Sequence, residues 1–558
     1  MRYLAARLVA PAALLLAGCA NAPVDPAAAC AALALPVPAG AIGLPSSGAR
    51  IESATLVAPS ALAVRAKVPF TPPPPEIAIA PALPEHCEVV GAILPVDPKA
   101  PSIRFQVNLP TRWNGNSLQF GGGGFNGVLI NGLALTPSPR PDLPAPLARG
   151  YVTYGTDSGH QNAPGVALQA FALNDEALAN FAHASYKKVR DVAVELMKRR
   201  YGEGPRKLYF FGSSEGGREG ITMAQRYPAD FDGIFSRVPV VNWVALQTAG
   251  TRAGVAQFGG GWLSPEATRV VHDAVIAACD ASDGLKDGII SDYEGCLRSF
   301  DASKLRCGPG AISGCLTEAQ LKAVQMIQTP TPLGFALANG VRGYPSWGRG
   351  GEAAPGTGPV GGWPSWQSGD APPTLPPGPA SSRAWLYGSG AIQYFIARDP
   401  NFDPRGFEPA KFEARMREVS ALMDSTNPDL TAFAAHGGKL VISVHMADYA
   451  QSPYAGIEYY KSVVTHLGQP LADSFLRLYV TPGADHMGIG APSGVDMLTV
   501  VSDWVEHGHA PGDLVQVAQE ARPPFAVTSA RPMCRYPGYP RYRGGDPTKA
   551  GSFECARR

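Results

Sequence analysis

The chain has 558 residues, of which 45% are hydrophobic and 9% aromatic. This composition is typical of globular proteins and excludes the disordered and fibrous classes. The 47 Lys and Arg residues nearly balance the 46 Asp and Glu residues, for a net charge of +1. No basic cluster follows the chain, so we expect no nucleic-acid partner.

Residues 1–19 have the order of an export signal with a lipobox. Arg2 and Arg7 precede the apolar run 8–16, and small residues lead to Cys19. The run is shorter than the roughly 20 apolar residues that span a bilayer. In a lipobox Cys19 is lipidated; the alternative is plain cleavage nearby, with secretion. We therefore expect an exported protein, either a periplasmic or outer-membrane-anchored lipoprotein or a secreted one, that touches a membrane only through an N-terminal lipid.

The cysteines predict disulfides. Nine cysteines without Cys19 leave eight, an even number, which favours pairing in an oxidising compartment. Counting alone leaves 105 pairings open. Proximity in the sequence suggests Cys279 with Cys296 and Cys307 with Cys315, which leaves Cys30 with Cys87 and Cys534 with Cys555. No spacing of Cys and His resembles a zinc site.

The first half of the chain alternates strands and helices after an Ala- and Pro-rich stretch. Residues 20–80 are expected to form an extended arm. Period-two hydrophobicity and short apolar runs predict strands, and one long amphipathic segment predicts a helix. The strands are expected at 103–109 and 117–120, paired as a hairpin, then at 151–154 and 207–211, with the helix at 180–201.

The alternation is lost over residues 243–430, where Gly, Pro and Trp are frequent, and it resumes afterwards. Strands are predicted at 439–444 and 475–480, and helices at 457–464 and 495–507. Strands that alternate with helices indicate a parallel α/β sheet. We therefore predict an α/β core formed by residues 81–242 and 431–558, with an inserted lid domain at 243–430.

One pentapeptide has the form of a nucleophile elbow. Gly212-Ser213-Ser214-Glu215-Gly216 is the only G-x-S-x-G in the chain, and it lies between a predicted strand and a predicted helix. Such a sharp turn exposes the serine hydroxyl and leaves room only for glycine on either side. Ser214 is therefore the candidate nucleophile.

A serine nucleophile needs a base that a third group orients. His486 lies in a loop directly after the last predicted strand, and Asp448 follows the strand at 439–444. The order Ser214, Asp448, His486 is the order of α/β-hydrolases and differs from those of chymotrypsin and subtilisin. As alternatives, His486 could cap a helix and Asp448 could form a turn. Taken together, the three residues predict a catalytic triad.

An acyl-transfer site also needs donors for the oxyanion, commonly two backbone N–H groups. Glu215, which follows the nucleophile, would supply one. The second is expected from the glycine-rich loop after an early strand, at Gly123 or Gly124. A flexible linker is the alternative reading of this glycine run.

An acidic loop suggests calcium. Asp280, Asp283 and Asp287 stand at relative positions 1, 4 and 8, with glycines between them. Carboxylate and carbonyl oxygens are the ligands that calcium prefers, and the carbonyls of Leu285 and Ile289 could complete the shell. The spacing is not that of an EF-hand. A solvated acidic turn is the alternative.

These pieces together resemble the tannase and feruloyl esterase family, whose members include a mono(2-hydroxyethyl) terephthalate hydrolase. The resemblance extends from about Ile103 to Cys555. The matching segments are 121–127, Thr156-Asp157-Ser158-Gly159-His160, 214–220, the loop from Cys279, Tyr394-Phe395 with Asp399-Pro400, and Asp503-Trp504-Val505-Glu506. It implies an α/β-hydrolase core with a large lid, structural Ca²⁺ in that lid, four disulfides, and hydrolysis of aromatic-acid esters of the feruloyl, galloyl or terephthalate half-ester type through an acyl-serine.

The chain departs from the family pattern at two places. The family usually carries cysteines directly before the nucleophile and directly after the catalytic histidine, joined by a disulfide, whereas Ser213 and Met487 occupy these positions here. Val444-His445 replaces a His-Gly pair. Two further functions stay open at this point, an amidase and a non-catalytic binding protein on the same fold.

Overall fold

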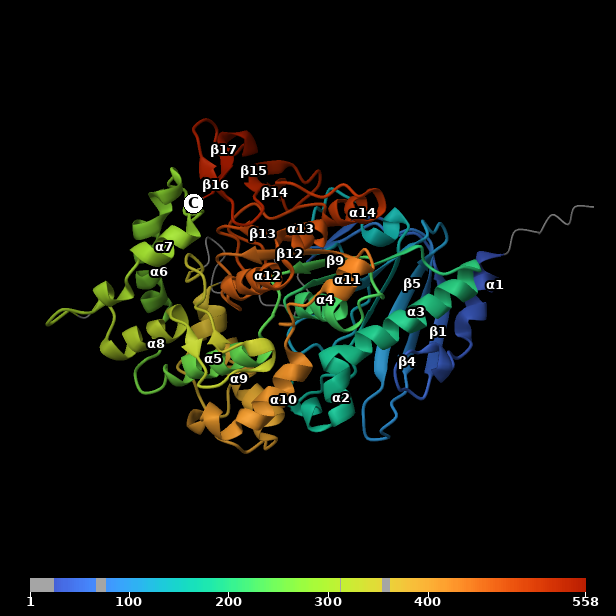
Figure 1. The fold of residues 1–558 in the computed structure, drawn as a ribbon, viewed down its shortest axis with the longest axis horizontal. Coiled ribbons are helices and arrows are strands. Elements are labelled where there is room, and N and C mark those ends of the chain that lie inside the picture. Colours follow the sequence, from blue (N-terminus) through green and yellow to red (C-terminus); the bar gives the residue numbers. More distant parts are fainter. Residues whose placement is uncertain (1–24, 67–76, 312, 354–361, 558) are drawn as a thin grey trace, which may run out of the picture.

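The computed structural model describes residues 25–66, 77–311, 313–353 and 362–557, so the predicted export signal and Cys19 lie outside the described residues. A nine-stranded sheet forms the centre of the molecule, in the order β1-β4-β5-β7-β6-β8-β9-β12-β13 (Figure 1). Its strands are β1 (Ala49–Val57), β4 (His86–Ile93), β5 (Ile103–Pro110), β6 (Asn116–Phe120), β7 (Val152–Thr156), β8 (Lys207–Ser213), β9 (Gly233–Arg237), β12 (Lys439–His445) and β13 (Leu476–Thr481).

The sheet is mixed. From β7 to β13 neighbouring strands are parallel, and from β1 to β7 they are antiparallel. The predicted strands at 103–109, 117–120, 151–154, 207–211, 439–444 and 475–480 are all present. The structure therefore confirms the α/β class, with a parallel half in which strand ends meet at one edge.

Helices cover both faces of the parallel half, as its buried strands require. On one face α4 (Glu215–Arg226) and α12 (Pro453–Leu467) pack against Phe210, Ile234 and Ile442. On the other face α14 (Met497–His507) packs against Tyr209, Phe235 and Val441. Adjacent residues of a strand point to opposite faces, so each strand supplies both layers of the core.

Two expectations about the first half are corrected. The described residues of the segment 20–80 do not form a simple extended arm: α1 (Pro26–Ala31) is followed by β1, which pairs with β4 as the edge strand, and β2 (Ala63–Ala66) pairs antiparallel with β3 (Ile77–Ala80). Strands β5 and β6 do not pair with each other, because β7 lies between them. A periodic pattern identifies a strand without identifying its neighbour in the sheet.

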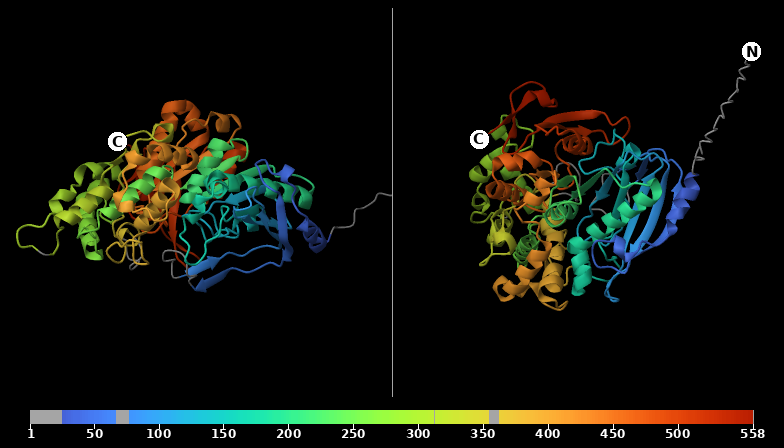
Figure 2. Two further views of the ribbon diagram at one scale, coloured as in Figure 1. Left: turned by 90° about the horizontal axis from the view of Figure 1, so that it is seen from below. Right: turned by 45° about the vertical axis from the view of Figure 1, so that its right-hand side comes forward.

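Residues 243–430, called the inserted region below, are mainly helical and lie at the opposite end of the molecule from β1 (Figures 1 and 2). The larger helices are α5 (Trp243–Val255), α6 (Pro265–Cys279), α8 (Glu318–Gln328), α9 (Arg383–Ala391) and α10 (Glu413–Met423). Their hydrophobic core includes Trp347 and Trp363 and is continuous with residues outside the region such as Phe125 and Tyr449. The two ends of the region meet: Ser425 N–H donates to the Val241 carbonyl over 3.0 Å.

The four disulfides are those suggested by proximity and elimination. Bridges join Cys30 to Cys87, Cys279 to Cys296, Cys307 to Cys315 and Cys534 to Cys555. The last one ties the C-terminal hairpin of β16 (Tyr539–Tyr542) and β17 (Phe553–Ala556), which follows the hairpin of β14 (Leu514–Gln519) and β15 (Val527–Met533). Among the described residues no helix combines the length and apolar character needed to cross a bilayer.

Candidate active site

Ser214 lies on the turn between β8 and α4 with φ 62° and ψ −121°, a conformation that non-glycine residues rarely adopt. The flanking glycines are required by contact. A Cβ on Gly212 would lie 2.1 Å from the Gly216 carbonyl oxygen, and one on Gly216 would lie 2.7 Å from the Gly122 carbonyl oxygen. The strained turn therefore has the geometry that a nucleophile elbow predicts.

His486 and Asp448 form a hydrogen-bonded pair. The Nδ1 atom of His486 lies 2.9 Å from Asp448 Oδ2 and 3.1 Å from Oδ1. The N–H groups of Ala450 and Gln451 donate to Oδ1 of the same carboxylate, which is 3% exposed. With Nδ1 bonded to the carboxylate, the other ring nitrogen, Nε2, is left to act on a substrate or nucleophile.

The nucleophile turn and the histidine loop lie side by side at the ends of β8 and β13. Arg237, the last residue of β9, donates from Nη1 to Ser213 Oγ over 2.8 Å and from Nη2 to the His486 carbonyl over 3.0 Å. Ser214 Oγ and His486 Nε2 form no hydrogen bond in the described part of the chain. Catalytic hydrogen bonds are often long without substrate and tighten in the Michaelis complex.

The glycine loop packs directly against the nucleophile turn. Gly216 N–H donates to the Gly122 carbonyl, and the N–H of Gly122 donates to Glu219 on α4. Gly123 N–H is bonded to Asn126 Oδ1. Within the described residues no hydrogen bond leaves the N–H of Gly124 or of Glu215. Of the two glycines predicted for the oxyanion hole, Gly124 is thus the one whose N–H has no hydrogen-bond acceptor among the described residues.

A buried charged network supports these loops from behind. Arg218 is fully buried and donates from Nε to Glu215 Oε1 over 2.6 Å and to the carbonyls of Ala182 and Met423. Burial raises the pKa of the Glu215 carboxyl to about 7, against the effect of Arg218. Glu219 accepts hydrogen bonds from Gly122, Asn126 and Tyr186. This carboxylate therefore fixes the glycine loop relative to α4.

Aromatic side chains border the pair formed by His486 and Asp448. The rings of Trp366 and Tyr449 lie 6.0 and 6.1 Å from the His486 ring, measured between centroids. Tyr387 lies 5.4 Å from Trp366 and 5.0 Å from Phe125, which follows the glycine loop. Aromatic surface of this kind suits a flat, aromatic ligand.

The acidic loop of the inserted region is partly buried. Asp280 and Asp283 are 8% and 2% exposed, and each accepts two backbone N–H groups of the loop. The third carboxylate, Asp287, accepts one backbone N–H, that of Ile289, and also a hydrogen bond from Arg531 of β15. Among the residues the structure describes, no group of three His, Cys, Asp or Glu side chains is placed to hold a metal ion.

The oxygen atoms of this loop are nevertheless of the kind that a hard cation prefers as ligands. Burial raises the pKa of the Asp283 carboxyl, and the nearby Asp287 raises it further. No hydrogen bond is found within the described residues to the carbonyl oxygens of Leu285 and Ile289. The set of oxygen ligands thus fits calcium, whereas the third carboxylate faces a guanidinium in this arrangement.

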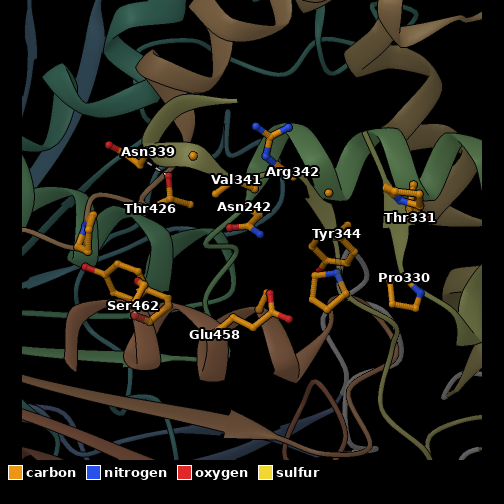
Figure 3. A pocket seen from close by; sticks show the side chains of 17 residues that line it. Asn242, Pro330, Thr331, Asn339, Val341, Arg342, Tyr344, Thr426, Glu458 and Ser462 are labelled. Carbon is orange, nitrogen blue, oxygen red and sulfur yellow. Dashed lines mark hydrogen bonds between the residues drawn. The ribbon is translucent and has the colours of Figure 1, made fainter. Parts of the chain in front are cut away.

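A cleft of about 440 Å³ lies away from the triad, between the inserted region and α12 (Figure 3). Arg342 and Glu458 are among its lining residues, and Asn339 donates from Nδ2 to Thr426 Oγ1 over 3.0 Å at its border. None of Ser214, Asp448 and His486 lines it. The cleft is therefore separate from the candidate catalytic residues.

Two residues at the site were not expected from the sequence. Arg237 links the two catalytic loops, and His445 Nδ1 lies 2.7 Å from the Asp485 carbonyl, so it holds the base of the histidine loop. Burial keeps the pKa of His445 well below its usual range. His445 follows the predicted strand at 439–444, which is the only signal that the sequence offers for it, whereas Arg237 ends β9, a strand that was not predicted from the sequence.

Comparisons with known proteins match nearly the whole length of the chain. The chain is 35% identical to an uncharacterized esterase of Agrobacterium fabrum, over 96% of this chain and 94% of that protein. It is 31% identical to the mono(2-hydroxyethyl) terephthalate hydrolase of Piscinibacter sakaiensis, with 86% of each chain covered. Among solved structures, feruloyl esterase B of Aspergillus oryzae superposes with a TM-score of 0.74 at 25% identity, covering 95% of this chain and 100% of that one.

These likenesses identify the core as an α/β-hydrolase fold. The sequence profile described as "Tannase and feruloyl esterase" matches residues 87–556, which is most of the chain. With relatives named as esterases and hydrolases across nearly the whole length, the chain belongs to the tannase and feruloyl esterase family of carboxylic ester hydrolases.

Proposed function

We propose that this protein is an exported serine esterase that cleaves esters of aromatic carboxylic acids through an acyl-Ser214 intermediate. The observation that carries the proposal is the strained Ser214 turn beside a His486 whose Nδ1 is bonded to Asp448 over 2.9 Å. This arrangement supplies a nucleophile, a base and the group that orients the base.

In the first half of the reaction, His486 Nε2 takes the proton of Ser214 Oγ as that oxygen bonds to the ester carbonyl carbon. The tetrahedral oxyanion takes hydrogen bonds from the N–H groups of Glu215 and Gly124, both free of other partners in the described residues. Collapse expels the alcohol, which receives the proton from His486. Water then attacks the acyl carbonyl carbon with His486 again as base; the bond to Ser214 Oγ breaks, His486 returns the proton to that oxygen, and the acid leaves.

An aromatic acyl group is favoured by the rings around the base. Trp366, Tyr449 and Tyr387 lie close to His486 or to the glycine loop, and stacked or edge-on aromatic contacts add about 0.5 to 1.5 kcal/mol beyond the burial of area. The terephthalate half-ester named for one relative and the feruloyl and galloyl esters of the family belong to this class.

The direct test is covalent labelling with an aryl phosphonate, which mimics the acylation step. We expect one phosphonyl adduct, located on Ser214 by peptide mass spectrometry, and loss of ester turnover in proportion to labelling. A panel of aromatic and short aliphatic esters should then give higher kcat/KM values for the aromatic acids. Labelling at another residue, or turnover that survives full labelling of Ser214, would contradict the mechanism.

Calcium is part of the same proposal. Asp280, Asp283 and Asp287 would hold the ion with the carbonyls of Leu285 and Ile289, once Asp287 exchanges Arg531 for the cation. A bound calcium would neutralise buried carboxylates and brace the inserted region against the C-terminal hairpins. The residues of the triad do the chemistry without it.

Export completes the proposal. An N-terminal signal ending at Cys19 and four disulfides elsewhere both suit a protein that works outside the cytoplasm. Palmitate labelling of cells that express the full chain, compared with Cys19→Ser, tests lipidation directly. Label on the parent and none on the variant is the expected result.

A further inference from the structure

Arg237 is a buried arginine at the end of β9 whose hydrogen bonds go to both catalytic loops. It is 7% exposed. One guanidinium nitrogen donates to the side chain of Ser213, the residue before the nucleophile, over 2.8 Å, and the other donates to the main-chain carbonyl of His486 over 3.0 Å. Its own carbonyl accepts the N–H of Ser214 over 3.0 Å.

These contacts place Arg237 between two segments that the chain itself leaves unconnected. Ser213 ends the inner strand β8, and His486 follows the edge strand β13, with β9 and β12 between these two strands in the sheet. No described disulfide joins them, since all four bridges lie elsewhere. Of the described side chains, Arg237 is the one that bonds to both the nucleophile turn and the histidine residue.

We propose that Arg237 is a positioning residue that sets the distance between Ser214 and His486 by holding their loops together through two hydrogen bonds. A guanidinium has a fixed planar fork, so its two nitrogens fix two acceptors relative to each other. An ammonium on a flexible stem fixes neither direction. Arg237 therefore acts on the rate of acyl transfer through geometry, and it is not itself a proton donor to substrate.

A second buried arginine provides the matched control. Arg477 of β13 is 5% exposed, and it also bonds to main-chain carbonyls, those of Asp473, Leu476 and Pro511. None of these acceptors belongs to a catalytic loop. Replacement of Arg477 therefore measures what the loss of a buried strand arginine does to stability alone.

The same geometry predicts a covalent substitute. Ser213 carries one of the two acceptors and Met487 follows the residue that carries the other; Met487 is 40% exposed, so its replacement removes little packing. Ser213→Cys with Met487→Cys would join the loops by a bond in place of the guanidinium. The disulfide should restore the kcat that an Arg237 variant loses. If Arg237 instead stabilised another part of the core, the disulfide would not restore kcat.

The experiment compares Arg237→Met, Arg237→Lys and Arg477→Met, each with and without the cysteine pair, by kcat, KM and melting temperature on one aromatic ester. We expect both Arg237 variants to lose 10- to 100-fold in kcat with KM changed less than threefold. We expect Arg477→Met to keep kcat within threefold at a lower melting temperature. Mass spectrometry without reductant should show the new bridge, with kcat of Arg237→Met recovered to within about threefold.

Mild reduction should abolish that recovery, with parent enzyme treated alongside to account for the four existing disulfides. If Arg237→Met does not fold alone, the variant that also carries the two cysteines is measured in its place. Folded and active protein from that triple variant supports the proposal. Parental kcat in Arg237→Lys and Arg237→Met, or equal losses in Arg477→Met, would overturn it. The inference rests on the proposed function, and Ser214→Ala separates the two: full activity in Ser214→Ala refutes the mechanism, whereas an inactive Ser214→Ala beside a fully active Arg237→Met refutes only the positioning role.

Discussion

The catalytic edge of the sheet and the periphery of the molecule are held together by different means. Around Ser214 and His486 the structure relies on parallel strand register and on hydrogen bonds from buried charged groups such as Arg218 and Arg237. The four disulfides tie the N-terminal segment, the inserted region and the C-terminal hairpins. The catalytic residues and the disulfides therefore lie in different regions of the molecule. Substitutions at the catalytic edge should change activity, whereas removal of disulfides should change stability.

The largest expected effect lies at the catalytic edge. Ser214→Ala should lower kcat by about four orders of magnitude or more, because the covalent pathway is lost, while the melting temperature stays near that of the parent. Ser474→Ala, at an exposed hydroxyl bonded to the Leu471 carbonyl, is the matched control and should keep full activity. The measurements are ester hydrolysis rates and thermal melts. A kcat of Ser214→Ala above one per cent of the parental value would contradict the assignment of Ser214 as the nucleophile.

Removal of disulfides should act on the periphery in order of loop length. Loop-closure entropy assigns about 4 kcal/mol to the Cys30–Cys87 bridge, which spans 57 residues, and about 2.5 kcal/mol to the Cys307–Cys315 bridge, which spans 8. Double serine variants measured by urea unfolding should follow this order, with kcat at 25 °C within twofold of the parent. A tenfold loss of kcat in still-folded protein would show that the two regions are not separate.

Acid should destabilise the core rather than the periphery. His160 is 3% exposed and stacks on Phe171, and burial lowers its pKa from 6.5 to about 4. The unfolded histidine binds a proton near pH 6.5 and the folded one only near pH 4, so stability is full above 6.5 and falls as the pH drops between these values. The shift corresponds to roughly 3 kcal/mol at about 1.4 kcal/mol per pH unit.

The measurement for acid sensitivity is the free energy of unfolding in urea between pH 7 and pH 4. His160→Phe should flatten part of this decline, whereas His466→Gln, at an exposed position, should leave it unchanged. An equal slope in the parent and in His160→Phe would mean that other groups carry the acid sensitivity.

The smallest expected effect concerns calcium. Chelation should lower the melting temperature by a few degrees and leave kcat unchanged at 25 °C, since none of the three carboxylates of the acidic loop is hydrogen-bonded to a triad residue in the described chain. Asp283→Asn should abolish both bound calcium, measured by elemental analysis, and the response to chelator. Metal-free protein with the same melting temperature in chelator would refute calcium binding at this loop.

Much of the core could be predicted from the sequence because its signals are local. Strand periodicity, the glycines beside Ser214 and the positions of Asp448 and His486 after strands all depend on neighbours in the chain. Pairs of cysteines 8 and 17 residues apart are local as well. Each of these features depends on residues that are close in the sequence, so residue spacing and steric limits are enough to predict it.

What could not be predicted depends on partners distant in sequence. The pairing of β1 with β4, the position of β7 between β5 and β6, and the contact of Arg531 with Asp287 each join segments that no short pattern relates. Arg237 is the clearest case. In the sequence it is simply a polar residue at the end of an apolar strand. Its two hydrogen-bond acceptors, Ser213 Oγ and the His486 carbonyl, can be identified only from the structure.

The two ends of the inserted region meet, with Ser425 N–H bonded to the Val241 carbonyl and Val244 N–H bonded to Asp424 Oδ1 over 2.9 Å. Segments whose ends lie together are the ones that a fold accepts as insertions. The part of the inserted region between residues 244 and 423 can thus be treated as an exchangeable unit. Chimeras that keep residues 241 to 244 and 423 to 425 and take the intervening helices from another esterase should transfer substrate range without rebuilding the triad, which makes this junction a natural place for engineering.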